Sequence, residues 1–297
     1  MRASSPFSRY LTSKARYLPP YISEETSIRR EKGDSFNALV QAKKSVTLNP
    51  YHRRNLSVLH ACVESNRKGS GTNKLVVLII SCEKYQDRCE GLYDLLTSHG
   101  FCVKVVFGKD AQMKHSYNTI IVEAGDPYED LAFKVRDAFL YVFEEYSTGT
   151  GILKIDDDIC VSDPPALLEQ IYKVLGNEHI QYGGRILRGG KSGVFRDWHF
   201  KKCSAAEWNR RPFGKKGIDR WAWGPFYYVS ASALRSFYEF NIMFPDEIIG
   251  EINEDLYVGR VLSEMGIEPT DLDLSKFGIT WDALPGDLET RRIWPVQ

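Results

Sequence analysis

The 297-residue sequence has no hydrophobic stretch long enough to cross a lipid bilayer. Its longest aliphatic run, Leu75–Ile80, is far shorter than the roughly 20 residues that a membrane-spanning helix needs. The charged residues near the N-terminus are followed by no apolar segment, so no secretory signal is predicted. These absences favour a cytoplasmic protein, with peripheral membrane contact left open.

Closely spaced cysteine pairs are absent as well. The six cysteines include no Cys-x-x-Cys motif, so the sequence does not indicate a zinc site. Cys82, Cys102 and Cys160 lie in or beside strand-like runs, where a reduced thiol packs as a small apolar group. We therefore expect a reducing compartment.

The chain has no excess of charge of either sign, because its formal net charge is zero. We accordingly predict no nucleic-acid partner. Residues 1–72, however, hold 13 Lys and Arg against 5 Asp and Glu, a net charge of +8, and the remainder is equally acidic. Such a basic segment could contact a membrane surface or a partner protein. A solvated, partly ordered extension is the alternative.

The pattern of apolar residues divides the chain into two parts. Residues 1–72 form a basic, partly helical N-terminal extension, with helices predicted over residues 36–49 and 56–64. Residues 67–73 read as a linker by composition. Residues 73–297 form the main domain.

In the main domain, predicted strands alternate with predicted helices. This alternation indicates an α/β fold with a mainly parallel sheet flanked by helices, in which ligands bind at the carboxyl ends of the strands. The predicted strands are residues 75–81, 101–107, 119–122, 151–155 and 180–187. The predicted helices are residues 85–98, 127–146, 164–175 and 253–265.

Three consecutive carboxylates, Asp156, Asp157 and Asp158, follow directly after a predicted buried strand. Packing them beside apolar segments is costly unless a counter-charge is present. A divalent cation is one solution, because Mg²⁺ and Mn²⁺ prefer carboxylate, water and phosphate oxygens. A solvent-exposed acidic turn, or a set of helix caps, is the alternative.

A second acidic pair, Glu254 and Asp255, stands in the first turn of the predicted helix over residues 253–265, with Asn253 as the expected cap. Acids in a first turn interact favourably with the helix dipole, which alone would explain them. The functional alternative is that one of them removes a proton from an acceptor hydroxyl. Spacing does not decide between the two.

The segment between the acidic sites is rich in glycine over residues 183–193 and basic over residues 196–220. It could form an acceptor loop for an anionic glycan or a lipid diphosphate, or be an ordinary surface loop. Trp221 and Trp223 could stack on a sugar ring, although strand tryptophans more often lie in the core.

Four segments together resemble the β-1,3-glycosyltransferase family that includes β-1,3-galactosyltransferases, β-1,3-N-acetylglucosaminyltransferases and Fringe enzymes. Residues 126–134 are similar to that family's Asp-x-Tyr-x-Asn-Leu-Thr-x-Lys pattern, and residues 153–159 to its Lys-x-Asp-Asp-Asp-Val. Residues 223–230 look like Tyr-Cys-x-Gly-x-Gly-Tyr-Val-Leu-Ser, and residues 254–259 like Glu-Asp-Val-Tyr-x-Gly. The match covers roughly residues 75–270.

The resemblance implies a GT-A (Rossmann-like) fold, a UDP-sugar donor, Mn²⁺ (or Mg²⁺) and inversion at the anomeric carbon. It also implies roles for single residues. Asp158 would bind the metal together with Asp156, and Asp156 and Asp157 would lie near the ribose. Asp255 would be the general base. Ser81 and Arg88 would meet the nucleotide, and the expected substrate contacts are Trp223, Tyr227 and Glu254.

The sequence departs from the family pattern in three respects. Pro225, Phe226 and Tyr227 stand where the family has Gly-x-Gly before its tyrosine, which would reshape the sugar or acceptor pocket. The late histidine that some members use as a metal ligand has no counterpart, because the last histidine is His199. The family's usual membrane anchor is also missing.

The sequence thus predicts an inverting, metal-dependent glycosyltransferase. It would move a hexose of the galactose or N-acetylhexosamine type from a UDP-sugar to a hydroxyl of a glycan acceptor, in polysaccharide biosynthesis. A metal-dependent nucleotidyltransferase or phosphohydrolase, and an inactive carbohydrate-binding module, are the alternatives.

Overall fold

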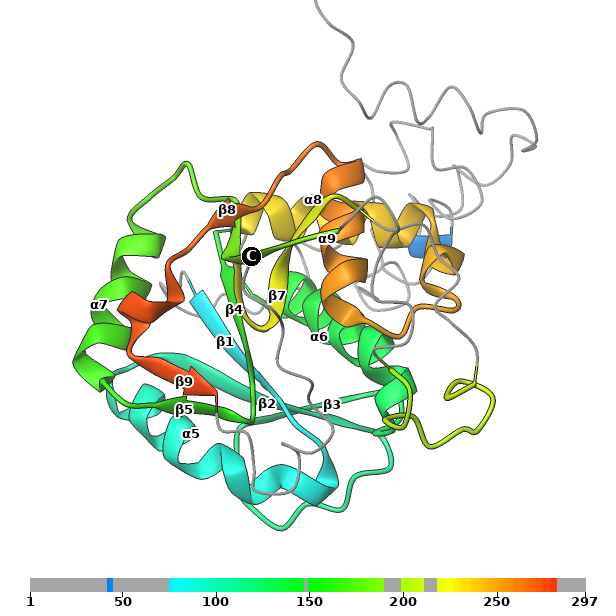
Figure 1. Cartoon of the computed structure of the whole chain (residues 1–297), viewed down its shortest axis with the longest axis horizontal. Coiled ribbons are helices and arrows are strands. Elements are labelled where there is room, and N and C mark those ends of the chain that lie inside the picture. The colour runs from blue at the N-terminus through cyan, green and yellow to red at the C-terminus, as the bar shows by residue number, and fades with distance from the viewer. Residues whose placement is uncertain (1–41, 45–74, 147–148, 190–198, 211–217, 282–297) are drawn as a thin grey trace, which may run out of the picture.

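A seven-stranded sheet forms the centre of the computed structural model, in the order β3-β2-β1-β4-β7-β6-β8 (Figure 1). A two-stranded sheet pairs β5 with β9. The structure describes residues 42–44, 75–146, 149–189, 199–210 and 218–281. The strands are β1 (Leu75–Ile80), β2 (Cys102–Gly108), β3 (Thr119–Val122), β4 (Gly151–Asp156), β5 (Ile159–Val161), β6 (Tyr182–Arg188), β7 (Arg220–Val229), β8 (Thr270–Asp271) and β9 (Ile279–Trp281).

The large sheet is mainly parallel. Strands β3, β2, β1 and β4 all run in one direction, and β8 is parallel to β6. Within the described part of the chain, β7 is the one strand of this sheet that opposes both of its neighbours, β4 and β6. The carboxyl ends of β1 and β4 therefore lie side by side, with Ile80 in register with Asp156.

Helices cover both faces of the sheet. The α-helices are α5 (Cys89–Ser98), α6 (Leu131–Glu145), α7 (Pro164–Leu175), α8 (Ala231–Met243) and α9 (Glu254–Glu264). The 3₁₀ helices are η1 (Glu83–Arg88), η2 (Tyr128–Asp130), η3 (Pro245–Ile248) and η4 (Leu274–Phe277). Helices α6, α8 and α9 pack on one face and α5 and α7 on the other (Figure 1).

Strand β1 shows why the two faces have separate hydrophobic clusters. Val76, Leu78 and Ile80 belong to the cluster beneath α6, α8 and α9, whereas Val77 and Ile79 belong to the cluster beneath α5 and α7. Side chains alternate in this way along any strand, and a strand covered on both faces is apolar at every position. Burial on both faces thus explains why the run Leu75–Ile80 is aliphatic without interruption.

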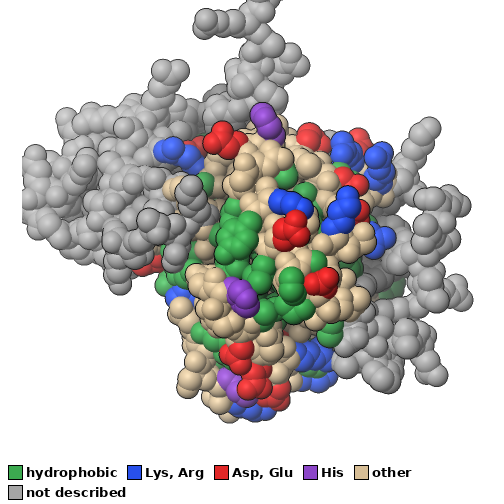
Figure 2. Space-filling model, turned by 90° about the vertical axis from the view of Figure 1, so that its left-hand side faces the viewer, with side chains coloured by type: hydrophobic (Ala, Val, Ile, Leu, Met, Phe, Trp, Pro, Cys, Tyr) green, Lys and Arg blue, Asp and Glu red, His purple; other side chains and the backbone are tan. Residues whose placement is uncertain are grey.

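The outer surface of α5 and α7 is the face shown in Figure 2. Hydrophobic side chains gather near the centre of this face, and acidic and basic side chains surround them. Because the charges are of both signs, this face presents no broad field of a single sign.

The predicted fold class is confirmed: the chain is an α/β protein with a mainly parallel sheet flanked by helices. Strand β3 and helix α7 have the predicted bounds. The predicted helix over residues 127–146 begins with the 3₁₀ turn η2, and the predicted helix over 85–98 begins with η1. Helix α9 ends before Gly266, whose φ of 78° is the left-handed conformation that favours glycine.

Most of the predicted N-terminal extension lies outside the described residues, as does the predicted helix over residues 56–64. Residues 42–44 are helical, which agrees with the helix predicted over residues 36–49. Ala42 is 1% exposed and belongs to the cluster beneath α6, and Lys43 forms an ion pair with Glu144 of α6. This part of the extension packs against the main domain. In the described part of the chain, no helix is both long and apolar enough to span a membrane.

Candidate active site

Two neighbouring parallel strands bring Ser81 and the acidic triplet together. Ser81 follows β1 and Asp157 follows β4, and the Ser81 hydroxyl donates to Asp157 Oδ2 at 2.7 Å. The Asp157 backbone N–H also donates to the carbonyl oxygen of Ile80 at 3.2 Å. Because the carboxyl ends of adjacent parallel strands meet at one edge, these residues lie where ligands bind in such sheets.

Arg88 lies at the end of η1, close to the same edge. Its guanidinium carbon is 3.7 Å from the ring centroid of Tyr85. The pKa of Asp157 is raised mainly by burial, and the positive charge of Arg88 is among the smaller effects that lower it. Ser81, Arg88 and Asp157 are therefore brought together, as the expected nucleotide contacts require.

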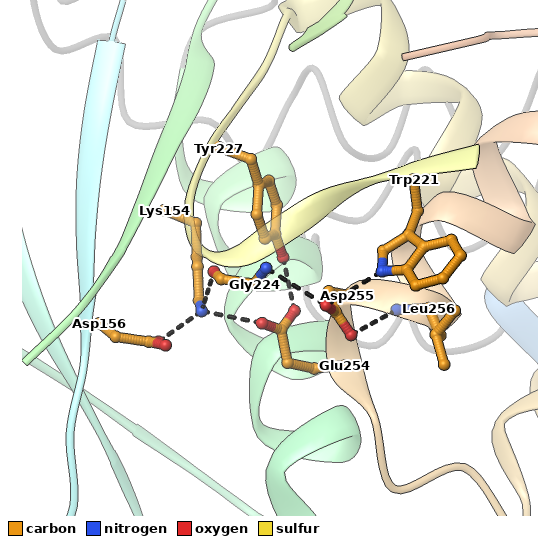
Figure 3. A network of polar contacts seen from close by, with 8 residues as sticks. All are labelled: Lys154, Asp156, Trp221, Gly224, Tyr227, Glu254, Asp255 and Leu256. Carbon is orange, nitrogen blue, oxygen red and sulfur yellow. Dashed lines mark hydrogen bonds and ion pairs between the residues drawn. The ribbon is translucent and has the colours of Figure 1, made fainter. Parts of the chain in front are cut away.

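The lysine that precedes the triplet connects it to the second acidic pair (Figure 3). Lys154 is fully buried, and its ammonium group donates to Asp156 Oδ1, to Glu254 Oε1 at 2.8 Å and to the carbonyl oxygen of Gly224 at 2.6 Å. An ammonium group has three N–H donors, so these contacts use all of them. Two acidic clusters from distant parts of the sequence thus share one cation, since Lys154 bonds to Asp156 close by and to Glu254 100 residues away.

Glu254 is held on both of its carboxylate oxygens. While Oε1 accepts from Lys154, Oε2 accepts from the hydroxyl of Tyr227 at 2.8 Å. Glu254 is 3% exposed and Tyr227 is fully buried, with its ring edge-on to that of Tyr182. Both residues were expected to contact substrate; in this structure their polar groups contact each other.

Asp255, the expected base, is fixed by three N–H donors (Figure 3). Its Oδ2 accepts from the indole of Trp221 and from the backbone of Gly224, each at 3.2 Å, and its Oδ1 accepts from the Leu256 backbone at 2.8 Å. Trp221 is 2% exposed, so its indole orients Asp255 and is not placed to stack on a sugar. A carboxylate held in this way has little freedom to rotate, which is useful for catalysis.

A bulge in β7 makes these contacts possible. The pairing of β6 with β7 shifts between the pairs Gly184–Tyr227 and Ile186–Ala222, so residues 223–226 stand opposite a single β6 residue. Bulges of this kind re-aim backbone and side chains and are frequent beside active sites. Here the bulge places Gly224 between Lys154 and Asp255, with a hydrogen bond to each.

Gly224, at the centre of that bulge, leaves little room for a side chain. A Cβ atom at Gly224 would lie 3.0 Å from Glu254 Oε1 and 3.4 Å from Asp255 Oδ2. The Gly224 carbonyl oxygen accepts from Lys154 while its N–H donates to Asp255. Gly224 therefore links the buried cation Lys154 to the carboxylate of Asp255.

The segment over residues 126–134 ties together the ends of three strands. Asp126 accepts from the Gly108 backbone at 2.7 Å, from the Glu83 backbone at 2.8 Å and from Lys134 at 2.6 Å. Lys134 is 2% exposed and also donates to the Ser81 carbonyl oxygen at 3.0 Å. Hydrogen bonds from Lys134 and the backbone lower the pKa of Asp126, although burial opposes them. This buried ion pair explains why Asp and Lys stand at those positions of the motif.

Tyr128, in the same motif, lies close to both acidic clusters. Burial is the main cause of its raised pKa, and the negative charges of Asp255, Glu254 and Asp156 raise it further. The neighbouring Glu129 accepts from residues of the segment over 199–210, which is thereby attached next to Tyr128. Tyr128 was not among the residues that the sequence singled out.

Burial and mutual repulsion weaken the acidity of the site. Burial raises the pKa of Asp156 to about 7, and the charges of Glu254 and Asp158 add to this although Lys154 opposes it. Burial likewise raises the pKa of Asp157 to about 7. The pKa of Asp255 is also raised, mainly by burial. The triplet is therefore a place where a bound cation would relieve a large electrostatic cost.

The donor chemistry of the triplet fits Mn²⁺ or Mg²⁺. Within the described residues, no three His, Cys, Asp or Glu side chains converge in the manner of a ready-made metal cage. Ions of this type are usually bound by one or two carboxylates together with phosphate oxygens and waters, rather than by a dedicated protein cage. Asp156, Asp157 and Asp158, all partly exposed, supply hard oxygen ligands of that kind.

The structure brings together the two acidic sites that the sequence analysis described one after the other. No role was predicted for Lys154, Gly224 or Tyr128. Of the two interpretations of Trp221, sugar stacking and a place in the core, the structure supports the core. The motif Lys-x-Asp-Asp-Asp was the one available signal for Lys154. Asn253 is the N-cap residue of α9, as expected, although its side chain makes no capping hydrogen bond.

The raised pKa values lead to a prediction about stability and pH. An aspartate whose folded-state pKa of about 7 lies above its unfolded value of roughly 3.9 binds more protons when folded, so it lowers stability as pH rises across that window. Asp157→Asn removes one such group. We expect the melting temperature of the metal-free variant to fall less than that of the unaltered chain between about pH 5 and about pH 8.

Thermal unfolding monitored by circular dichroism at several pH values, without added divalent ions, measures this difference. An equally steep fall in the melting temperature of both proteins would show that Asp157 is not buried in its charged form.

A parallel α/β sheet with two acidic clusters joined at the carboxyl ends of its strands is an arrangement suited to a sugar-transferring enzyme. The family model described as Galactosyltransferase matches residues 107–273, which is more than half of the chain. The chain belongs to the galactosyltransferase family and is a glycosyltransferase.

Other comparisons are weaker. No curated protein matches the chain in sequence. Among solved structures, 4-diphosphocytidyl-2C-methyl-D-erythritol synthase is 14% identical, over 74% of this chain and 97% of that one, with a TM-score of 0.40. Glucosyl-3-phosphoglycerate synthase from Mycobacterium tuberculosis, in complex with Mn²⁺, UDP-glucose and phosphoglyceric acid, is 13% identical over 77% and 78%, with a TM-score of 0.37. The bifunctional glycosyltransferase WbbM is 9% identical over 91% and 57%, also at 0.37.

Proposed function

We propose that this glycosyltransferase is inverting and metal-dependent, and that it moves a hexose of the galactose or N-acetylhexosamine type from a UDP-sugar to a hydroxyl of a glycan acceptor. The observation that carries the proposal is the Lys154 ammonium, which contacts Asp156 of the triplet and Glu254 beside Asp255. This contact supports a single centre in which donor and acceptor meet.

Asp255 is the general base of the proposed reaction. It accepts the proton of the acceptor hydroxyl as that oxygen bonds to the anomeric carbon from the face opposite the leaving group. The bond between the anomeric carbon and the diphosphate oxygen breaks, and its electron pair leaves with UDP. Burial raises the pKa of Asp255, which makes it a better proton acceptor than an exposed aspartate. Trp221 and Gly224 keep its Oδ2 in place.

The donor end is formed by residues at the ends of β1 and β4. Ser81 orients Asp157 toward the nucleotide, and Arg88 contributes a positive charge there. Asp158 and Asp156 would hold the divalent ion. When bound, Mn²⁺ or Mg²⁺ supplies charge neutralisation for the departing diphosphate. Trp223, which is partly exposed, is the remaining proposed substrate contact.

Calorimetry with UDP, in the presence and absence of Mn²⁺, tests the proposal. A UDP-sugar transferase should bind UDP much more tightly with the ion than without it. Incubation with a panel of UDP-sugars, followed by measurement of released UDP, identifies the donor. Metal-independent UDP binding, or no hydrolysis of any UDP-sugar, would contradict the proposal and favour an inactive carbohydrate-binding module.

Asp158→Ala should weaken UDP binding only when Mn²⁺ is present. The variant loses one of the proposed metal ligands but keeps Ser81 and Arg88 at the donor end. Loss of one ligand or supporting group at a metal site typically costs about 10–100-fold in affinity. Calorimetry measures the change, and Asp163→Ala, which removes the cap of α7, is the control. Equal UDP affinity of the Asp158 variant and the unaltered chain would remove Asp158 from the metal shell.

Two further parts of the sequence-based interpretation stay predictions. They are the cytoplasmic location and the contact of residues 1–72 with a membrane surface or a partner protein. Membership of the galactosyltransferase family favours sugar transfer over a nucleotidyltransferase or phosphohydrolase reaction.

A further inference from the structure

A cation lies directly beside the bulge in β7. The single β6 residue opposite residues 223–226 is Arg185. Its guanidinium carbon is 5.7 Å from the ring centroid of Trp223. Arg185 is exposed, and it makes no ion pair with a carboxylate in the part of the chain that the structure describes. Its charge is therefore available to a ligand.

Arg185 is suited to bind an anion. A guanidinium group above an aromatic ring keeps its N–H edge free, and that edge matches the two oxygens of a carboxylate or a phosphate. The aromatic partner also limits the conformations of the long side chain, so less entropy is lost on binding.

The pair lies at the acceptor side of the site. Trp223 directly precedes Gly224, whose N–H donates to Asp255 Oδ2 at 3.2 Å. Arg185 thus lies over the ring of the residue that precedes Gly224, and Gly224 donates to the oxygen that would receive the acceptor proton. We therefore expect a group bound by Arg185 to belong to the acceptor.

A second cation, Lys202, lies near Asp255 on a segment outside the sheet. The Lys202 ammonium lies 5.3 Å from the ring centroid of Tyr128, and the charge of Asp255 acts on Tyr128. Glu129 fixes this part of the chain by accepting from the backbones of Ser204 at 3.0 Å and Ala205 at 2.9 Å.

The backbone next to Lys202 is itself unusual. Lys201 has a φ of 67°, a left-handed conformation that is uncommon outside glycine and is often found at functional sites. It lies in a turn that the Lys202 N–H closes by donating to the carbonyl oxygen of His199 at 3.0 Å. The segment over residues 199–210 is thus an ordered part of the surface beside Tyr128 and Glu129.

Charge is distributed unevenly around the base. The centre is acidic, with Asp156, Asp157, Asp158, Glu254 and Asp255 against the single buried cation of the network. Arg185 and Lys202 stand outside it, each over an aromatic ring. A neutral sugar could only accept hydrogen bonds from these two cations, whereas an anionic one would also be attracted and oriented by their charge.

We propose that the glycan acceptor carries a carboxylate or a phosphate, which Arg185 binds while Lys202 provides a second positive charge. This inference rests on the proposed function, because it assigns the acceptor of the same site. The shared chemistry is an anionic sugar; a uronic acid and a sugar phosphate are its two sources.

Equilibrium binding tests the proposal without relying on turnover. Calorimetry with UDP and Mn²⁺ present compares methyl β-D-glucoside with methyl β-D-glucuronide and with methyl β-D-glucoside 6-phosphate. We expect at least one anionic glycoside to bind about 10- to 100-fold more tightly than the neutral one, as hydrogen bonds to charged groups predict. Which of the two binds identifies the source of the charge.

Arg185→Gln should abolish this preference, and Lys202→Gln should reduce it. The matched control is Arg235→Gln, which removes an arginine that is half exposed on α8 and paired with Glu239. We expect the control to keep the full preference. Release of UDP from the donor in the absence of acceptor should be the same in all three variants.

Equal binding of the neutral and anionic glycosides would overturn the inference, as would an intact preference in the Arg185 variant or no binding of either anion. Failure of the proposed function looks different. In that case the unaltered chain neither binds UDP in a Mn²⁺-dependent way nor hydrolyses a UDP-sugar.

Discussion

Asp255→Asn should reduce the rate of sugar transfer by about 10²–10⁴-fold, the usual contribution of a positioned general base. The amide has the same shape as the carboxylate and can still accept from Trp221 and Gly224, but it cannot take a proton. The binding of UDP with Mn²⁺ should remain, because the triplet is unchanged. Single-turnover kinetics together with calorimetry separate the two effects.

The matched control is Asp246→Asn, which makes the same substitution at an exposed carboxylate of η3. It should keep full activity. If Asp255→Asn retained most of the transfer rate while Asp246→Asn did the same, another group would have to be the base. Loss of UDP binding in the Asp255 variant would instead indicate damage to the whole site.

Lys154→Met should be among the most destabilising single changes in the domain. It leaves the carboxylate of Glu254, which is 4% exposed, and that of Asp156, which is 27% exposed, without their shared cation. Removing one partner of a buried ion pair typically costs about 3–5 kcal/mol. Urea unfolding followed by fluorescence measures the loss, and we expect transfer activity to fall with it.

Two variants make this prediction sharper. In Lys154→Met combined with Glu254→Gln, one uncompensated charge is gone, so part of the lost stability should return. Lys276→Met, at an exposed lysine that pairs with Asp273, should leave stability unchanged. A Lys154→Met protein as stable as the unaltered chain would mean that the three contacts of the ammonium have no energetic role.

The sheet could be predicted because a strand that is buried on both faces has an uninterrupted run of apolar residues in its local sequence. Strand β1 is apolar at every position, since both of its faces are covered, and Gly266 marks the end of α9. The position of the acidic triplet at a strand end followed from the same pattern. These features depend on neighbours within a few residues, and so they are visible in the sequence.

Lys154 could not be found in this way, because its role depends on contacts across the fold. Its partner Glu254 is 100 residues away in the sequence, and a buried lysine looks like any other lysine until both carboxylates are placed. Trp221 was open to two interpretations for the same reason. Its side chain could stack on a sugar or lie in the core, and only the position of α9 beside β7 shows that it is buried and donates to Asp255.

The bulge in β7 has a consequence for how such a site can diversify. Within the described strands, residues 223–225 are in register with neither neighbour, because Ala222 pairs with Ile186 and Tyr227 with Gly184 on the β6 side, and Phe226 pairs with Ile155 on the β4 side. Substitutions of Trp223 or Pro225, which are both partly exposed, can therefore alter the surroundings of Asp255 while the register of the sheet is kept. Phe226, which is fully buried, and Gly224, which bonds to both Lys154 and Asp255, set the limits of that freedom.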